Sequence, residues 1–166
     1  MNVAIVCEYN PFHLGHLHQI NQIKKIFPEA NIIAVMSGNV VQRGEFSILD
    51  KLHKTKIALE NGINCVIEIP SVFSLQSAQN FSYYAIKIID TIGCDYVSFG
   101  IETEIEDLIS YKDFLLENEA NIKQFIAENK NTSYNKNVME FSKQNYSNYS
   151  DEIFKSNNIL ALEYMK

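Results

Sequence analysis

The chain has 166 residues, of which 46% are hydrophobic and 20% are charged, and its formal net charge is −6. These values are typical of a soluble globular protein. No apolar run approaches the ~20 residues that cross a bilayer, and the N-terminus lacks a signal-peptide pattern. Three widely spaced cysteines argue against a disulfide framework or a zinc knuckle, so we expect a cytoplasmic protein; the sequence identifies no metal-ligating residues.

Short apolar runs alternate with amphipathic patterns along the first hundred residues. Strands are predicted at 3–6, 31–36, 65–69 and 95–99, and helices at about 15–27, 50–60 and 74–91. This alternation predicts βαβ units and a parallel sheet of at least four strands, which is a Rossmann-like α/β fold. Right-handed crossovers bring the carboxyl ends of the strands to one edge, where ligands bind in open α/β sheets.

The pattern changes after Ile101. Residues 102–130 are helical in pattern and acidic, and residues 131–157 are rich in Asn, Ser, Lys and Tyr, with a short helical pattern around Val138. Ser156, Asn157 and Asn158 predict an N-cap cluster for a last helix. We therefore expect additional helices after the fourth strand, and a single catalytic domain over residues 1–166.

The glycines fall into two groups. Gly62 and Gly93 each follow a helix pattern and precede a strand, which is typical of C-terminal caps. The other four follow predicted strands and would surround a ligand at the carboxyl edge; they are Gly15, Gly38, Gly44 and Gly100. Asp50 is predicted to cap the second helix.

Two histidines flank Gly15 between the first strand and the first helix. His13 and His16 are three residues apart, so they share one face of the first helical turn. Backbone N–H groups at a helix start carry partial positive charge, and imidazoles donate hydrogen bonds to phosphoryl oxygens. Gly15 lets a ligand lie against the backbone. We expect the histidines to donate to the α- and β-phosphates of a nucleoside triphosphate; the alternative is two polar residues at a helix start.

Arg43 is the only arginine of the chain, and it is followed by Gly44 in the loop after the second predicted strand. Its guanidinium suits a carboxylate or a phosphate. The alternative is an ion pair with Glu45 or Asp50. The first 56 residues hold all four histidines and six basic against four acidic residues, whereas the remainder is acidic and a poor RNA surface.

Other polar residues at this edge have two interpretations each. Asn10 binds a phosphate or a base, or only holds its turn. His18 binds the ligand or is simply solvated. Gln76, Ser77 and Gln79 contact a substrate or cap a helix. Cys7 is interpreted as a core residue rather than a nucleophile, since no nearby charge pattern favours a thiolate. The chain has no P-loop or G-x-G-x-x-G pattern, which excludes nucleotide binding of the kinase, GTPase or dehydrogenase kind.

The run from His13 to His16 resembles the HxGH motif of the nucleotidyltransferase superfamily. The residues around it are similar to the tRNA(Met) cytidine acetate ligase family. The similar segments are residues 8–16, 35–39, 41–45, 50–51, 66–68, 70, 75–78, 99–102 and 157–160. The ordered set is much more specific than HxGH alone.

The resemblance implies a HUP-type nucleotidyltransferase fold and an ATP-dependent, adenylate-forming ligase. In that family acetate and ATP give acetyl-adenylate, and the acetyl group passes to N4 of the wobble cytidine of elongator tRNA(Met). We expect His13, His16 and Arg43 to be catalytic and Mg²⁺ to accompany ATP; by the resemblance Gly100, Asn157 and Asn158 contact ATP. The implied ATP loop comprises Cys7, Glu8, Tyr9, Asn10, Pro11, Phe12, His13, Leu14, Gly15, His16, Leu17, His18, Gln19 and Ile20.

Three departures from the family pattern stand out. Leu14 replaces a usual Asn, and His18 stands one residue before the expected histidine. Family members are also longer, with a second phosphate-binding motif and a C-terminal RNA-binding region, so we expect this chain to be an N-terminal portion that contacts tRNA mainly through the missing part. The alternatives are a small-molecule adenylyltransferase and a truncated nucleotide-binding module without turnover.

Overall fold

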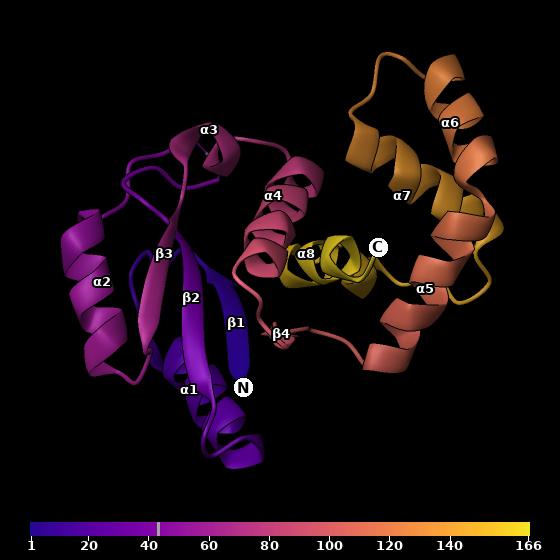
Figure 1. Ribbon diagram of the computed structural model, residues 1–166. Helices are drawn as coiled ribbons and strands as arrows, with labels where there is room; N and C mark the ends of the chain where they lie inside the picture. Colours follow the sequence, from indigo (N-terminus) through magenta and orange to yellow (C-terminus); the bar gives the residue numbers. More distant parts are fainter. Residues whose placement is uncertain (43) are drawn as a thin grey trace. The chain divides into compact units, whose positions relative to one another are not determined.

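A computed structural model describes residues 1–42 and 44–166 (Figure 1). These residues form two compact units, Met1–Gly100 and Ile101–Lys166. The expectation of one catalytic domain over residues 1–166 stays a prediction. In the described part of the chain, no helix has both the length and the apolar character needed to cross a membrane.

The first unit is built on a parallel sheet. Its strands are β1 (Asn2–Cys7), β2 (Asn31–Ser37), β3 (Cys65–Ile69) and β4 (Tyr96–Ser98). The described strands lie in the order β3-β2-β1-β4, and each neighbouring pair is parallel. This arrangement confirms the predicted Rossmann-like α/β fold. The register pairs Cys7 with Met36, so β1 and β2 end side by side at the carboxyl edge.

Helices connect these strands. They are α1 (Leu14–Ile26), α2 (Lys51–Glu60), α3 (Ser71–Ser74) and α4 (Ala78–Thr91). The predicted continuous helix over 74–91 is wrong, because the Ser77 hydroxyl accepts a hydrogen bond from the Asn80 N–H and starts α4 anew. The predicted caps are confirmed: Asp50 accepts from two N–H groups of α2, and Gly62 and Gly93 have φ of +101° and +69°.

Both faces of the sheet are covered. On one face, Ile20 and Ile23 of α1 and Ala58 of α2 belong to one buried cluster with residues of β1 and β2. On α4 the buried residues are Phe81, Ser82, Ala85 and Ile89, and this helix contacts β2. Right-handed crossovers place α4 on the face opposite to α1 and α2. The sheet therefore holds the start of α1 rigidly at its carboxyl edge.

The second unit is helical. It contains α5 (Ile105–Glu117), α6 (Glu119–Glu128), α7 (Tyr134–Asn145), the 3₁₀ helix η1 (Asp151–Phe154) and α8 (Ser156–Met165). Helices after the fourth strand are thus confirmed. The predicted N-cap cluster at residues 156–158 is wrong, since Lys155 is the N-cap and the three residues lie in the first turn of α8.

Candidate functional site

The two histidines form a reciprocal cap at the start of α1. His13 is the N-cap residue with an extended backbone, rather than a residue of the first turn. Its Nδ1 accepts a hydrogen bond from the Gly15 N–H (3.1 Å), and Nδ1 of His16 accepts from the His13 N–H (3.2 Å). The two rings stack with centroids 3.7 Å apart. The structure therefore brings His13 and His16 together.

These hydrogen bonds assign the protonation state of the two imidazoles. A ring nitrogen that accepts from a backbone N–H carries no proton, so a neutral ring keeps its proton on Nε2. Burial, together with the neighbouring His13, lowers the pKa of His16 from 6.5 to about 4. His16 is therefore neutral at physiological pH, and the cap leaves an Nε2–H donor on each ring.

Gly15 makes room for this cap. A Cβ at position 15 would lie 3.0 Å from Cε1 and 3.1 Å from Nδ1 of His13, both closer than ordinary contacts. The glycine thus admits the His13 ring against the helix start. From the sequence, Gly15 was expected to make room for a ligand; the structure shows that it also makes room for the His13 ring.

Tyr9 supports His16 from below. Its side chain is 2% exposed, and its ring centroid lies 4.7 Å from that of His16. The φ of Tyr9 is +45°, in the left-handed region, which costs an aromatic residue free energy. Cys7 is buried beside it, and burial raises the pKa of the Cys7 thiol to about 12. Cys7 belongs to the buried hydrophobic cluster of the first unit, which confirms its interpretation as a core residue.

Two polar side chains connect the segment of residues 8–13, here the first loop, to the segment of residues 38–50, here the second loop. Oε1 of Glu8 accepts from the Gln42 N–H (2.7 Å) and the Ser37 hydroxyl (3.4 Å). Oδ1 of Asn10 accepts from the Ile48 N–H (2.7 Å) and from the Ser47 hydroxyl. Asn10 therefore holds loop structure, as the sequence allowed.

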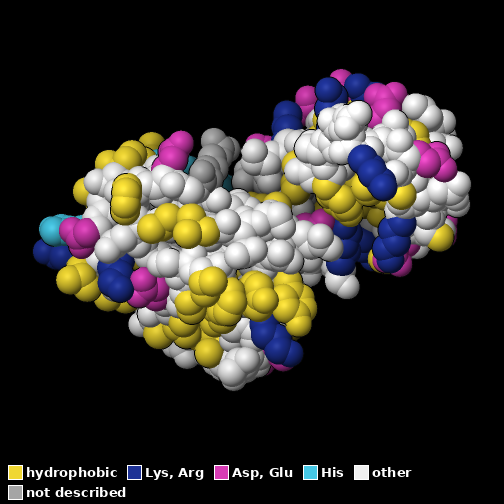
Figure 2. Space-filling view, turned by 90° about the horizontal axis from the view of Figure 1, so that it is seen from above, with side chains coloured by type: hydrophobic (Ala, Val, Ile, Leu, Met, Phe, Trp, Pro, Cys, Tyr) yellow, Lys and Arg dark blue, Asp and Glu magenta, His cyan; other side chains and the backbone are white. Residues whose placement is uncertain are grey.

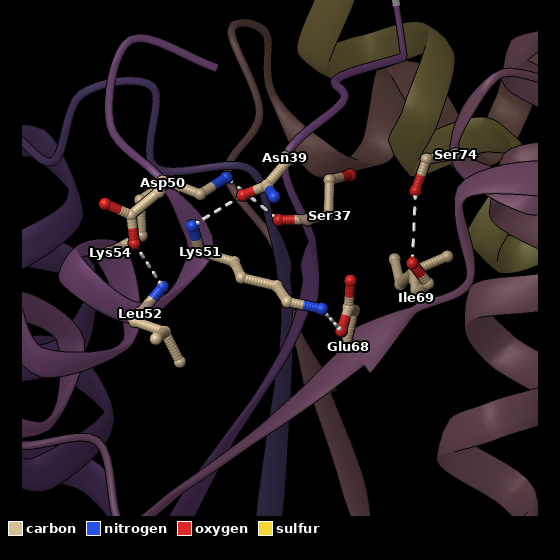
Figure 3. A network of polar contacts seen from close by, with 9 residues as sticks. All are labelled: Ser37, Asn39, Asp50, Lys51, Leu52, Lys54, Glu68, Ile69 and Ser74. Atoms are coloured by element: carbon tan, nitrogen blue, oxygen red, sulfur yellow. Dashed lines mark hydrogen bonds and ion pairs between the residues drawn. The ribbon is translucent and has the colours of Figure 1, made fainter. Parts of the chain in front are cut away.

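The base of the second loop carries an ion pair (Figure 3). Nζ of Lys51, at the start of α2, lies 2.7 Å from Oε2 of Glu68 in β3. A Cβ at Gly38 would lie 2.2 Å from Oε1 of Glu68, so this glycine leaves room for the carboxylate. Asn39 accepts from the Lys51 N–H (2.7 Å) and fixes the start of α2. Both charged side chains remain nearly half exposed at the carboxyl edge.

The rest of the implied ATP loop differs in exposure. Pro11, Leu14 and His18 are exposed, whereas Ile20 is fully buried in the core. Leu17 and Gln19 are half-buried, and the Gln19 amide donates to the Ser98 carbonyl (3.1 Å). Phe12 packs against Tyr9 and His16.

Arg43 lies outside the described residues. The remaining implied ATP contacts are Gly100, Asn157 and Asn158, which lie far from the first loop in sequence. Gly100 is exposed, and a Cβ there would meet open space. Asn158 is buried, and its side chain accepts from the Glu102 N–H (2.8 Å) and donates to the Glu152 carbonyl (2.8 Å), whereas Asn157 is exposed. The Asn157 amide donates to the Glu102 carboxylate (3.5 Å) at the surface.

Sequence reasoning missed Lys54, a buried residue of α2 whose Nζ donates to the carbonyls of Glu8 and Ser37. A signal was present: Lys54 precedes the buried Ala58 by four residues, so both lie on the inward face of α2. Its length lets it reach the carboxyl edge from that face.

Hydrophobic side chains are exposed near the same edge. Phe46 and Ile48 of the second loop and Leu52 of α2 are 85%, 70% and 75% exposed. Figure 2, seen from above, shows several hydrophobic groups at the surface of the first unit. Exposed hydrophobic side chains therefore lie on the second loop and at the start of α2.

The pH dependence of stability tests the state of His16. In the unfolded chain this histidine binds a proton below about pH 6.5, while in the fold it stays neutral until about pH 4. The unfolded state thus binds more protons between these values, and the contribution of His16 to stability is lost as the pH falls from 6.5 to 4. NMR titration of the His16 ring should give a midpoint near 4. A midpoint near 6.5 would contradict the assigned cap.

The comparisons with known proteins agree with this geometry. A family model described as HIGH Nucleotidyl Transferase matches residues 1–166. The chain is 42% identical to a tRNA(Met) cytidine acetate ligase of Fusobacterium nucleatum and 37% identical to one of Ligilactobacillus salivarius, in each case over 99% of this chain. It covers 40% and 41% of those relatives, so it spans about two fifths of their length.

Solved structures give the same result. Thermotoga maritima TmcAL bound with alpha-thio ATP matches with a TM-score of 0.84 and 34% identity, over 99% of this chain and 42% of that one. The apo form of TmcAL matches with a TM-score of 0.83 at the same identity, over 99% of this chain and 41% of that one. The fold is thus of the HUP type, as the resemblance implied. With its whole length matched by the family model and its two histidines at the helix start, the chain belongs to the HIGH nucleotidyl transferase family.

Proposed function

We propose that this chain supplies the ATP-binding, adenylate-forming part of a tRNA(Met) cytidine acetate ligase that works in the cytoplasm. The observation that carries the proposal is the reciprocal His13–His16 cap, which leaves two Nε2–H donors at the N-terminus of α1. The similarity to ligases of this name and to a protein that binds an ATP analogue supports it.

The chemistry follows from the Nε2–H donors of the two imidazoles. An oxygen of acetate attacks the α-phosphorus of ATP, the bond to the β-phosphate oxygen breaks, and acetyl-adenylate and pyrophosphate form. Charge grows on the phosphate oxygens, and fixed N–H donors of His13 and His16 stabilise it without transferring a proton. Arg43 would pair with a phosphate or with the acetate carboxylate.

The remaining contacts are also part of the proposal. By the resemblance, residues 7–20, Gly100, Asn157 and Asn158 would contact ATP. The N4 amine of the wobble cytidine of elongator tRNA(Met) would then take the acetyl group and release AMP. In this proposal tRNA binds mainly through residues beyond those of this chain.

In this proposal magnesium arrives with ATP. Among the described residues no group of three or more His, Cys, Asp or Glu side chains is arranged for a metal ion. Of the carboxylates at the carboxyl edge, Glu8 accepts from Gln42 and Ser37, and Glu68 pairs with Lys51. A magnesium ion would instead arrive on the phosphate oxygens of ATP, which suits its preference for oxygen and water ligands.

Calorimetry with ATP, followed by an acetate-dependent pyrophosphate exchange assay, tests the proposal. We expect ATP to bind the chain and acetate to support the exchange. His53→Ala is the matched control, because His53 is an exposed histidine of α2 outside the proposed site. Exchange supported by phosphopantetheine or a nicotinate nucleotide instead of acetate would favour a small-molecule adenylyltransferase. ATP binding without exchange would favour a module without turnover, and absence of ATP binding would refute both readings.

A further inference from the structure

Lys54 is a buried cation whose described hydrogen bonds go to backbone carbonyls rather than to a carboxylate. Its side chain is 1% exposed, and Nζ donates to the carbonyl oxygens of Glu8 (2.8 Å) and Ser37 (2.9 Å); Figure 3 shows the second of these. Burying an ammonium group is costly unless strong hydrogen bonds compensate it, and burial lowers the pKa of Lys54. Lys54 is the only buried lysine of α2, and it lies beside the carboxyl ends of β1 and β2.

The two carbonyls that Lys54 binds lie where two strands end. Ser37 is the last residue of β2, and Glu8 follows Cys7, the last residue of β1. Carbonyl groups at strand ends need partners from outside the sheet. Their oxygens also carry partial negative charge, which would repel a triphosphate, so a cation between them offsets this repulsion.

Glu8 extends the effect of Lys54 to the second loop. Its main chain is held by Lys54, and its carboxylate accepts from the Gln42 N–H at 2.7 Å. Asn10 makes the second link, to Ser47 and Ile48. The first and second loops are therefore connected by side chains of the first and backbone groups of the second.

We propose that Lys54 is a positioning residue that fixes the main chain of Glu8 and Ser37 and, through Glu8, couples the first loop to the second loop. This inference rests on the proposed function for its consequence in ATP binding. With 1% of its side chain exposed, Lys54 itself does not contact a ligand.

Hydrogen–deuterium exchange and ATP calorimetry on the whole chain test this role. In Lys54→Met we expect amide exchange to rise about tenfold or more at Gln42 and Ile48, and ATP affinity to fall about tenfold, because a hydrogen-bonded charge is lost. Amides of β1 and β2 should stay protected. The matched control is Lys56→Met, since Lys56 is 73% exposed on the same helix. Unchanged loop exchange in Lys54→Met would overturn the proposal.

Two further variants keep the test decisive. Lys54→Gln retains a neutral donor and serves where Lys54→Met does not fold; equal loss of protection in loops and strands would reduce Lys54 to a structural residue. Glu8→Ala should raise Gln42 exchange, and adding Lys54→Met should raise it less than additively, since both act through one link. Full additivity would contradict coupling through Glu8. Wild-type chain that binds no ATP refutes the proposed function, while the exchange results still decide the role of Lys54.

Discussion

Replacing His16 with alanine should slow acetyl-adenylate formation by a factor of about 30 to 1,000, which corresponds to ~2–4 kcal/mol of barrier stabilisation. The Nε2–H of this neutral ring is one of two fixed donors at the start of α1, and alanine offers no donor in its place. Because His16 is only half-buried and lies at a helix end, the fold should remain intact. Single-turnover formation of acetyl-adenylate, with circular dichroism as the check on folding, measures the effect.

Two conservative variants separate catalysis from capping. Asparagine at position 16 keeps an acceptor where Nδ1 receives the His13 N–H, but it has no group at the place of Nε2. Glutamine reaches the place of Nε2 with an amide donor. We therefore expect His16→Asn to keep stability and lose rate, and His16→Gln to recover part of the rate. Rates equal to wild type in His16→Ala, or a loss of the same size in the control His53→Ala, would remove His16 from the mechanism.

The sequence predicted the frame of the site because local patterns dictate it. A β-branched run, a turn and an amphipathic helix are enough to place His13 and His16 at the carboxyl edge, and the structure confirms that their rings meet. The reciprocal cap itself was not predicted, since histidine is an unusual capping residue. It depends on a Gly15 that admits the His13 ring.

Other features escaped prediction because they depend on contacts distant in sequence. Lys54 can be buried because its Nζ donates to two carbonyl groups at the ends of β1 and β2. Asn158 reads as a helix cap from its neighbours, yet its amide is used by Glu102 and Glu152. Ser77 was a candidate cap, yet the expected continuous helix over 74–91 did not include the break that it introduces between α3 and α4.

Replacing Ile20 with alanine should lower the free energy of unfolding by about 2–5 kcal/mol, the range for a large aliphatic side chain removed from a packed core. Ile20 is 0% exposed and belongs to the cluster that attaches α1 to β1 and β2. Although it falls within the implied ATP loop, its side chain faces the core, so the expected defect is one of stability. Urea unfolding followed by circular dichroism measures it.

The matched control is Ile26→Ala, on the same helix but 66% exposed, which should change stability by less than about 0.5 kcal/mol. ATP affinity measured well below the unfolding midpoint should be nearly unchanged in Ile20→Ala, because the histidine cap depends on backbone groups of residues 13–16. Lost ATP affinity in a variant that remains folded would instead give the Ile20 side chain a direct role in the nucleotide site. Equal destabilisation by both variants would contradict the packing of α1 described above.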